Sequence, residues 1–166
     1  KEFVAHQWDF SSVQLMLPFD LNQYINVWAE GNIPFGERNR KGIEKASHIT
    51  ALYGIHSPYS GDVRRKIFKF GQITCKLTET DVFEAEDFDV LHIKIESKKL
   101  VELNKLLTEL EHTNKHPVYK PHSTICYLKK GEGKKYKGLK DFAQSITFNT
   151  VDFSSKNGFH EEVNLV

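Results

Sequence analysis

The sequence predicts an α+β fold in which most strands pair antiparallel. Stretches with the two-residue period of strands alternate with stretches that have helical spacing, in the order strand, helix, strand, helix, three strands, helix and further strands. Tight acidic turns join the three central strands, and antiparallel neighbours need only such short turns. The 166 residues, 39% of them hydrophobic, suit one domain or one compact two-lobed unit with a substantial core.

The first 70 residues predict two strand-helix pairs separated by a polar segment. Asp20 can cap the first helix, and its apolar residues recur on one face. Pro34 and Gly36 interrupt the polar segment, which predicts a mobile loop. In order, the predicted elements are a strand over 13–18, a helix over 20–30, the loop over 31–42, a strand over 48–54 and a helix over 62–70.

The remainder contains the clearest helix of the chain, over 98–110, where five leucines recur at helical spacing. Alternating stretches separated by turns predict strands on both sides of it. These strands span 73–77, 80–84 and 89–95 before the helix, and 123–128, 145–153 and 161–165 after it. The chain also contains one short internal repeat. The segment Asp9-Phe10-Ser11-Ser12 recurs at 152–155, which fits two lobes related by pseudo-symmetry.

Charge is segregated along the chain, although the formal net charge is only +1. Residues 77–96 carry seven acidic residues and one Lys, whereas residues 115–140 carry eight Lys and one Glu. Two solvated faces explain this pattern, and so does an anionic ligand held near the basic segment. The near-neutral total excludes a generic polyanion binder.

Cysteine content and hydropathy indicate the compartment. Cys75 and Cys126 are too few for a disulfide scaffold, which favours a reduced intracellular environment. No apolar run reaches the roughly 18 residues of a membrane span, and residues 1–6 lack the pattern of a signal peptide. We therefore expect a cytoplasmic protein with no membrane partner and no stable protein partner.

Two short stretches match each other and carry the chemistry. His48-Ile49-Thr50 and His122-Ser123-Thr124 each lie in a predicted strand, and each is followed by a hydrophobic residue, one further position and a Tyr. Residues i and i+2 of a strand share a face, roughly 6.5 to 7 Å apart. Two such strands side by side surround one space with two imidazoles and two hydroxyls.

This set suits phosphodiester cleavage without a metal. One neutral His can accept a proton from the attacking hydroxyl, and one protonated His can donate to the leaving oxygen. The Thr hydroxyls can donate to non-bridging phosphate oxygens. Neither Cys lies at ligand spacing from a second Cys or a His, so a zinc site is disfavoured and no metal-binding residues are expected. The competing interpretation is a pair of buried, hydrogen-bonded core histidines.

Three further residues are candidates for binding a substrate. Lys120 has the same strand parity as His122, which predicts a position near phosphate, and Tyr119 precedes it as a candidate base contact. Phe83 lies in the acidic-turn region, where it either stacks on a base or packs in the core.

Strand parity also sorts the neighbours of the two motifs. Tyr53 and Tyr127 fall on the opposite face from the histidines, which predicts core packing, whereas Cys126 falls on the face of His122. His92, between two apolar residues of a strand, is expected to be structural.

The two motifs resemble the paired His-hydrophobic-Thr-hydrophobic motifs of the two-histidine (2H) phosphoesterase superfamily. Residues 48–56 and 119–136 also resemble a phage-associated branch of it, which includes the anti-CBASS nucleases that destroy cyclic oligonucleotide alarm signals. The resemblance extends from about 10 to 165, with Ser123 and Ala51 departing from the pattern at positions that point away from the site. It implies a single two-lobed domain over 1–166, with a bilobal fold of two mostly antiparallel sheets, a central cleft, helices outside and no cofactor.

The leading functional hypothesis is therefore metal-independent hydrolysis of 3′,5′-phosphodiester bonds in small cyclic di- or trinucleotides. Within the same chemistry, the alternatives are opening of a 2′,3′-cyclic phosphate and cleavage of 2′,5′-linked oligoadenylate. A non-catalytic nucleotide sponge is disfavoured, because binding alone needs no paired acid and base. A phage or viral origin would place the protein in the host cell cytosol.

Overall fold

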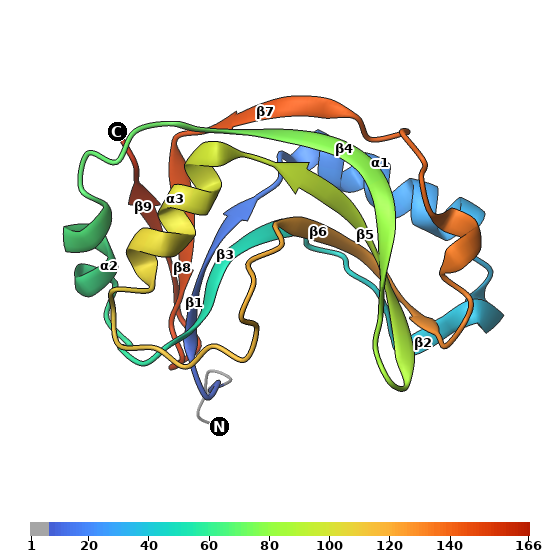
Figure 1. Ribbon diagram of the computed structural model, residues 1–166, viewed down its shortest axis with the longest axis horizontal. Helices are drawn as coiled ribbons and strands as arrows, with labels where there is room; N and C mark the ends of the chain where they lie inside the picture. The colour runs from blue at the N-terminus through green and yellow to red at the C-terminus, as the bar shows by residue number, and fades with distance from the viewer. Residues whose placement is uncertain (1–6) are drawn as a thin grey trace, which may run out of the picture.

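The computed structural model describes residues 7–166 and forms an arch (Figure 1). Its strands make one sheet in the order β7-β4-β5-β6-β3-β1-β8-β9. The remaining strand, β2, pairs with β6, and all pairs are antiparallel. The strands are β1 (Ser11–Met16), β2 (Arg38–Ile43), β3 (His48–Ile55), β4 (Ile73–Glu84), β5 (Phe88–Glu96), β6 (His122–Lys129), β7 (Gln144–Phe148), β8 (Thr150–Ser154) and β9 (His160–Asn164).

Helices lie on the side of β3 and β6 that faces away from the concavity, and they leave the concave side open (Figure 1). They are α1 (Phe19–Asn32), α2 (Ser60–Ile67) and α3 (Lys98–Leu107), with the short 3₁₀ helices η1 (Phe35–Glu37) and η2 (Lys134–Tyr136). The α+β prediction is confirmed. The 1–166 domain stays a prediction, and its residues 1–6 lie outside the part that the structure describes.

The sheet consists of two lobes that meet at the top of the arch. We call them the β3 lobe (β1, β3, β8 and β9, with α2 and α3 against it) and the β6 lobe (β2 and β4 to β7, with α1 against it). A single residue pair, Ile49 with Ser123, joins β3 to β6. The two sheets expected from the resemblance are therefore continuous at one edge.

The core lies between the sheet and the helices. Leu100, Leu103 and Leu107 of α3 are fully buried, and the Ser97 side chain caps this helix by accepting a hydrogen bond from the Leu100 backbone N–H. Complete burial of a Leu side chain contributes about 1.5 to 3 kcal/mol. The same face of the sheet buries Ile49 and Ile125, so the opposite residues of those strands point into the concavity.

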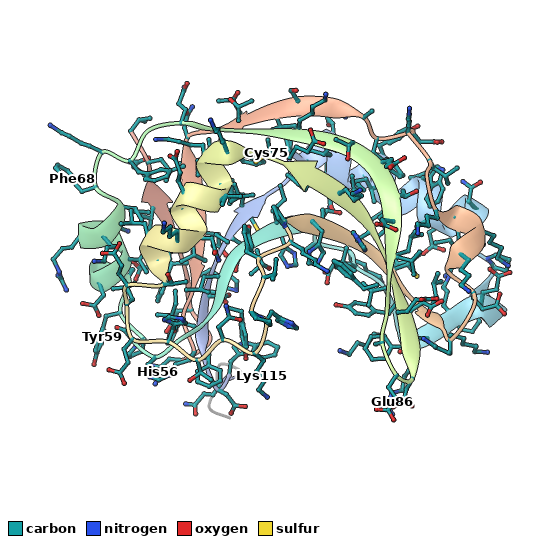
Figure 2. The ribbon with its side chains drawn as sticks, viewed as in Figure 1. His56, Tyr59, Phe68, Cys75, Glu86 and Lys115 are labelled. Carbon is teal, nitrogen blue, oxygen red and sulfur yellow. The ribbon has the colours of Figure 1, made fainter. Side chains whose placement is uncertain are left out.

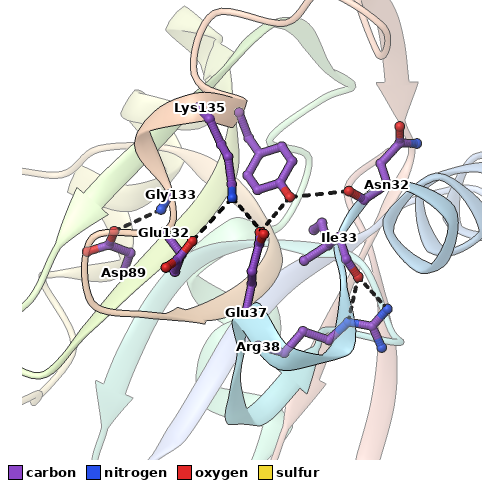
Figure 3. A network of polar contacts seen from close by, with 9 residues as sticks. Asn32, Ile33, Glu37, Arg38, Asp89, Glu132, Gly133 and Lys135 are labelled. Carbon is purple, nitrogen blue, oxygen red and sulfur yellow. Dashed lines mark hydrogen bonds and ion pairs between the residues drawn. The ribbon is translucent and has the colours of Figure 1, made fainter.

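The predicted mobile loop over 31–42 is wrong, because it contains the end of α1, η1 and most of β2. Long-range contacts that local sequence does not reveal hold this segment (Figure 3). Glu37 accepts hydrogen bonds from Lys135 Nζ (2.6 Å) and the Tyr136 hydroxyl (2.7 Å). Within the segment, Arg38 also donates to the Ile33 carbonyl. The hydrogen bond from Lys135 is the main cause that lowers the pKa of Glu37.

Two other predicted boundaries also change. The strands predicted over 73–77 and 80–84 are one strand, β4, with an irregularity between Leu77 and Thr80. The strand predicted over 145–153 divides at Asn149 into β7, which pairs with β4, and β8, which pairs with β1. The repeated Asp-Phe-Ser-Ser segments lie on β1 and β8, which are neighbours in one lobe, so this repeat does not relate the two lobes.

Ion pairs join part of the acidic segment to the basic segment, an arrangement that neither interpretation of the charge pattern included. Lys137 Nζ lies 3.5 Å from Asp81, and Lys134 Nζ lies 3.8 Å from Glu84. The buried Asp89 accepts hydrogen bonds from the backbone N–H groups of Gly131 and Gly133. Within residues 7–166, no helix is long and apolar enough to cross a membrane.

Candidate active site

The two His-x-Thr motifs meet where the lobes join. Because Ile49 pairs with Ser123 in an antiparallel register, His48 lies opposite Thr124, and Thr50 lies opposite His122. The four side chains are half-buried on the concave face, whereas Ile49 and Ser123 behind them are almost completely buried. Figure 1 shows the beginnings of β3 and β6 side by side at the crown of the arch.

Each histidine is held by the same backbone contact. His48 Nδ1 lies 2.7 Å from the Ala46 carbonyl oxygen, and His122 Nδ1 lies 2.7 Å from the Lys120 carbonyl oxygen. A carbonyl only accepts hydrogen bonds, so Nδ1 carries the proton in both rings. Each neutral ring therefore keeps the lone pair on Nε2 for proton transfer.

A β-bulge follows the motif in both strands. On β3, Gln14 pairs with Thr50 but Val13 pairs with Leu52, so Ala51 is the additional residue. On β6, His92 pairs with Thr124 but Leu91 pairs with Cys126, so Ile125 is the additional residue. Each bulge reverses strand parity immediately after the motif Thr.

The bulges overturn the parity argument for three residues. Tyr53 and Tyr127 lie on the concave face with the histidines, where Tyr53 is 50% exposed and Tyr127 is half-buried. Cys126 turns into the core instead, where burial raises the pKa of its thiol to about 11. A thiol of that kind is unsuited to nucleophilic chemistry at neutral pH.

The environment of His122 is more enclosed than sequence reasoning showed. Phe83 meets the His122 ring edge to face at 4.8 Å between centroids, and His92 meets it at 5.2 Å. Phe83 also stacks on His92 at 3.8 Å. Burial lowers the pKa of His122, with a further contribution from His48, and burial lowers the pKa of His92 to about 4.

Pairing across the strands gives each motif Thr a different neighbour. In the β3 lobe, Thr50 pairs with Gln14, whose amide donates to the Asp152 carboxylate. In the β6 lobe, Thr124 pairs with the buried His92, which in turn pairs with Asp81. The expectation that His92 is merely structural thus missed a third imidazole beside the site; its position opposite a motif Thr becomes visible only in the strand pairing.

Of the three candidate binding residues, the structure brings Phe83 against His122. The Tyr119 hydroxyl donates to the Thr50 carbonyl oxygen (2.7 Å), the ring packs against the core, and burial raises the pKa of its phenol. Lys120 has an exposed side chain, and its carbonyl orients His122. Figure 2 shows the loop that leads to β6, with Lys115, and the β4–β5 hairpin, with Glu86, on opposite sides of the concavity.

Within the described residues, no group of three or more His, Cys, Asp and Glu side chains is arranged to hold a metal ion. This observation does not test whether catalysis needs a metal ion, so independence from metal stays a prediction.

No family model and no curated protein matches the chain, whereas several solved structures do. E. coli LigT complexed with NADP+ matches with a TM-score of 0.65 at 14% identity over 95% of each chain. The protein TT0787 of Thermus thermophilus matches with a TM-score of 0.64 at 14% identity, covering 94% of this chain and 97% of that one.

A structure described as a phosphoesterase matches with a TM-score of 0.60 at 13% identity, over 95% of this chain and 96% of that one. The chain has the fold of the LigT-like two-histidine phosphoesterases. At this level of identity the comparison concerns the fold, and the function has to be argued from the site.

Proposed function

We propose that this protein is a metal-independent phosphodiesterase in which His48, Thr50, His122 and Thr124 act on one phosphate. The observation that carries the proposal is the pair of imidazoles held alike by backbone carbonyls, with neither Nε2 atom hydrogen-bonded to another of residues 7–166 and with two hydroxyls between them. Core histidines would not need matched orientation beside an open concave face. The fold shared with phosphoesterases supports the same conclusion.

The two histidines take different roles. The more enclosed His122 resists protonation, so it is the general base that deprotonates the attacking hydroxyl, as its lowered pKa favours. His48 is the general acid that protonates the leaving oxygen. Thr50 and Thr124 donate to the non-bridging oxygens, whose charge grows in the transition state.

The substrate proposed is a 3′,5′-linked ribonucleotide, with cyclic di- and trinucleotide signals as the leading class. The attacking group is the 2′-hydroxyl next to the phosphate, because attack within one molecule has a large entropic advantage. A 2′,3′-cyclic phosphate forms while the 5′-oxygen leaves, and water then opens it with the roles of the histidines reversed. E. coli LigT has been solved with 3′-AMP and with ATP, which supports nucleotide recognition on this fold.

A nucleotide panel incubated in EDTA tests the proposal. We expect the ribo form of a cyclic dinucleotide to be cleaved and the 2′-deoxy form to bind but remain intact. Cleavage of both forms at similar rates would show that water attacks directly. If only a 2′,3′-cyclic phosphate is opened, that substrate class replaces the cyclic dinucleotides. Loss of all activity in EDTA would overturn the metal-independent mechanism.

A further inference from the structure

Two tyrosines occupy equivalent positions on the two walls of the concavity. Tyr53 and Tyr127 each follow a catalytic His by five residues, and both reach the concave face because a bulge intervenes. β3 and β6 start together at the crown and run down opposite sides of the arch (Figure 1). At about 3.3 Å per residue, with one residue taken up by the bulge, the Cα of each tyrosine lies roughly 13 Å along the strand from the Cα of its motif His.

Hydrogen bonding and pairing in the β3 lobe establish the orientation of Tyr53. Tyr53 pairs with Ser12, and the Ser12 hydroxyl donates to Gln14, which itself pairs with Thr50. Paired residues share a face, so Tyr53 lies on the face of Thr50. Phe10 contacts its ring edge to face at 5.8 Å, and half of the tyrosine remains exposed.

In the β6 lobe, strand pairing establishes the orientation of Tyr127. Tyr127 pairs with Val90, and Thr124 pairs with His92 two residues further along β5, so Tyr127 lies on the face of Thr124. Burial raises the pKa of Tyr127, and the Thr124 side chain opposes that shift. Phe88 contacts the ring at 6.1 Å between centroids. The ammonium group of the exposed Lys41 lies 5.0 Å from the centre of the Tyr127 ring, and this flexible side chain can yield to another planar group.

We propose that Tyr53 and Tyr127 are stacking platforms for two nucleobases, one on each side of the phosphate. The preferred substrate is then an internucleotide phosphodiester with a base on both sides, rather than a single nucleotide with a terminal cyclic phosphate. This inference rests on the proposed function. Tyr presents a rigid ring that stacks on any base, so the two subsites select for the presence of bases more than for their identity.

The bulges distinguish this arrangement from ordinary surface tyrosines. Without them, the parity of β3 and β6 would bury both rings, and each bulge leaves one residue out of the sheet pairing. The same irregularity occurs at the same distance from the motif in both strands, with an aromatic side chain turned to the concavity each time. A ligand centred between the motifs is the common reason.

Fluorescence of 2-aminopurine, which is quenched when the base stacks, tests the two platforms separately. The probe is a 2′-deoxy dinucleotide that carries 2-aminopurine either before or after the phosphate. We expect Tyr53→Ala to abolish quenching at one position only and Tyr127→Ala to abolish it at the other. Each change should weaken dinucleotide binding roughly 5- to 150-fold, the range for loss of one stacked base.

Matched variants separate stacking from folding. Tyr53→Phe and Tyr127→Phe should retain quenching, because the ring remains. Tyr59→Ala should bind like the wild type, since Tyr59 is 70% exposed on the outside of the arch (Figure 2). Unchanged quenching in both Ala variants, or no quenching on binding to the wild type, would overturn the inference.

Cleavage of the corresponding ribodinucleotide tests the phosphodiesterase activity separately from the two base-stacking subsites. If the wild type binds and quenches the probe but cleaves no ribodinucleotide, the subsites stand and the phosphodiesterase assignment falls. If it cleaves the ribodinucleotide while both Ala variants keep wild-type KM and quenching, the enzyme stands and the subsites fall.

Discussion

The β3 lobe and the β6 lobe present the same motif in different surroundings. In both, a carbonyl two residues earlier orients the imidazole, and a bulge follows the Thr. In the β6 lobe, however, Phe83 and His92 enclose His122, whereas the corresponding neighbour in the β3 lobe is the amide of Gln14. Shared hydrogen bonding sets the geometry of both histidines, and burial beside these two rings lowers the pKa of His122.

Loss of either histidine gives the largest expected effect. His48→Ala and His122→Ala should each lower kcat by about 10² to 10⁴, the usual contribution of a positioned acid or base. A substrate with a 4-nitrophenol leaving group needs no acid, so it should restore most of the activity of His48→Ala but not of His122→Ala. Steady-state kinetics with both substrates measures this, and the reverse pattern would exchange the two roles.

His92 should make stability depend on pH. Its pKa is about 4 in the folded state and 6.5 in the unfolded chain, so below pH 6.5 the unfolded state binds a proton that the folded state does not. The free energy of unfolding should therefore fall by roughly 2 kcal/mol between pH 7.5 and pH 5 from this residue. Urea unfolding at both pH values measures the change.

The control for this titration is His92→Gln, which copies the residue that the β3 lobe has at the equivalent position. It should remove this part of the pH dependence. An equally steep loss of stability in His92→Gln would assign the effect to other groups.

The threonines should matter less than the histidines and about equally in the two lobes. Each hydroxyl supplies one hydrogen bond to a charged phosphate, worth about 1.5 to 3 kcal/mol. Thr50→Val and Thr124→Val should therefore lower kcat/KM about 10- to 150-fold. Valine keeps the branched shape, so circular dichroism should show a folded protein. A folded Thr variant as inactive as the His variants would mean that the hydroxyl has a larger role.

Phe83→Ala should make the two lobes more alike. Removing this ring exposes His122, whose pKa is lowered mainly by burial, so its pKa should rise toward 6.5. A general base must be neutral, so the acidic limb of the kcat/KM profile should move to higher pH. An acidic limb that stays in place would show that another group controls it.

The smallest effect concerns the junction between the lobes. Ile49 fills its buried position, whereas the opposing Ser123 buries a hydroxyl that has no hydrogen-bond partner among residues 7–166. An unpaired hydroxyl is costly to bury, so Ser123→Ala should leave stability unchanged or raise it by up to about 1 kcal/mol. Chemical denaturation measures the change, and clear destabilisation would indicate that the hydroxyl is bonded in solution.

Local sequence was sufficient to predict that each motif presents a His and a Thr on one strand face, and to predict most of the elements. A His and a Thr two residues apart must share a face of any regular strand, so each motif was interpretable without its neighbours. The leucine spacing of α3 predicted its buried face in the same way, and Leu100, Leu103 and Leu107 are all buried.

Tertiary structure decided what depends on distant partners. The polar segment over 31–42 became ordered through Lys135 and Tyr136, about a hundred residues away. The faces of Tyr53 and Tyr127 were reversed because β1 and β5 pair with β3 and β6 in a shifted register. Side-chain alternation is a local property of a strand, but a bulge arises only from the fit between two strands, so one sequence alone could not show which tyrosines lie on the concave face.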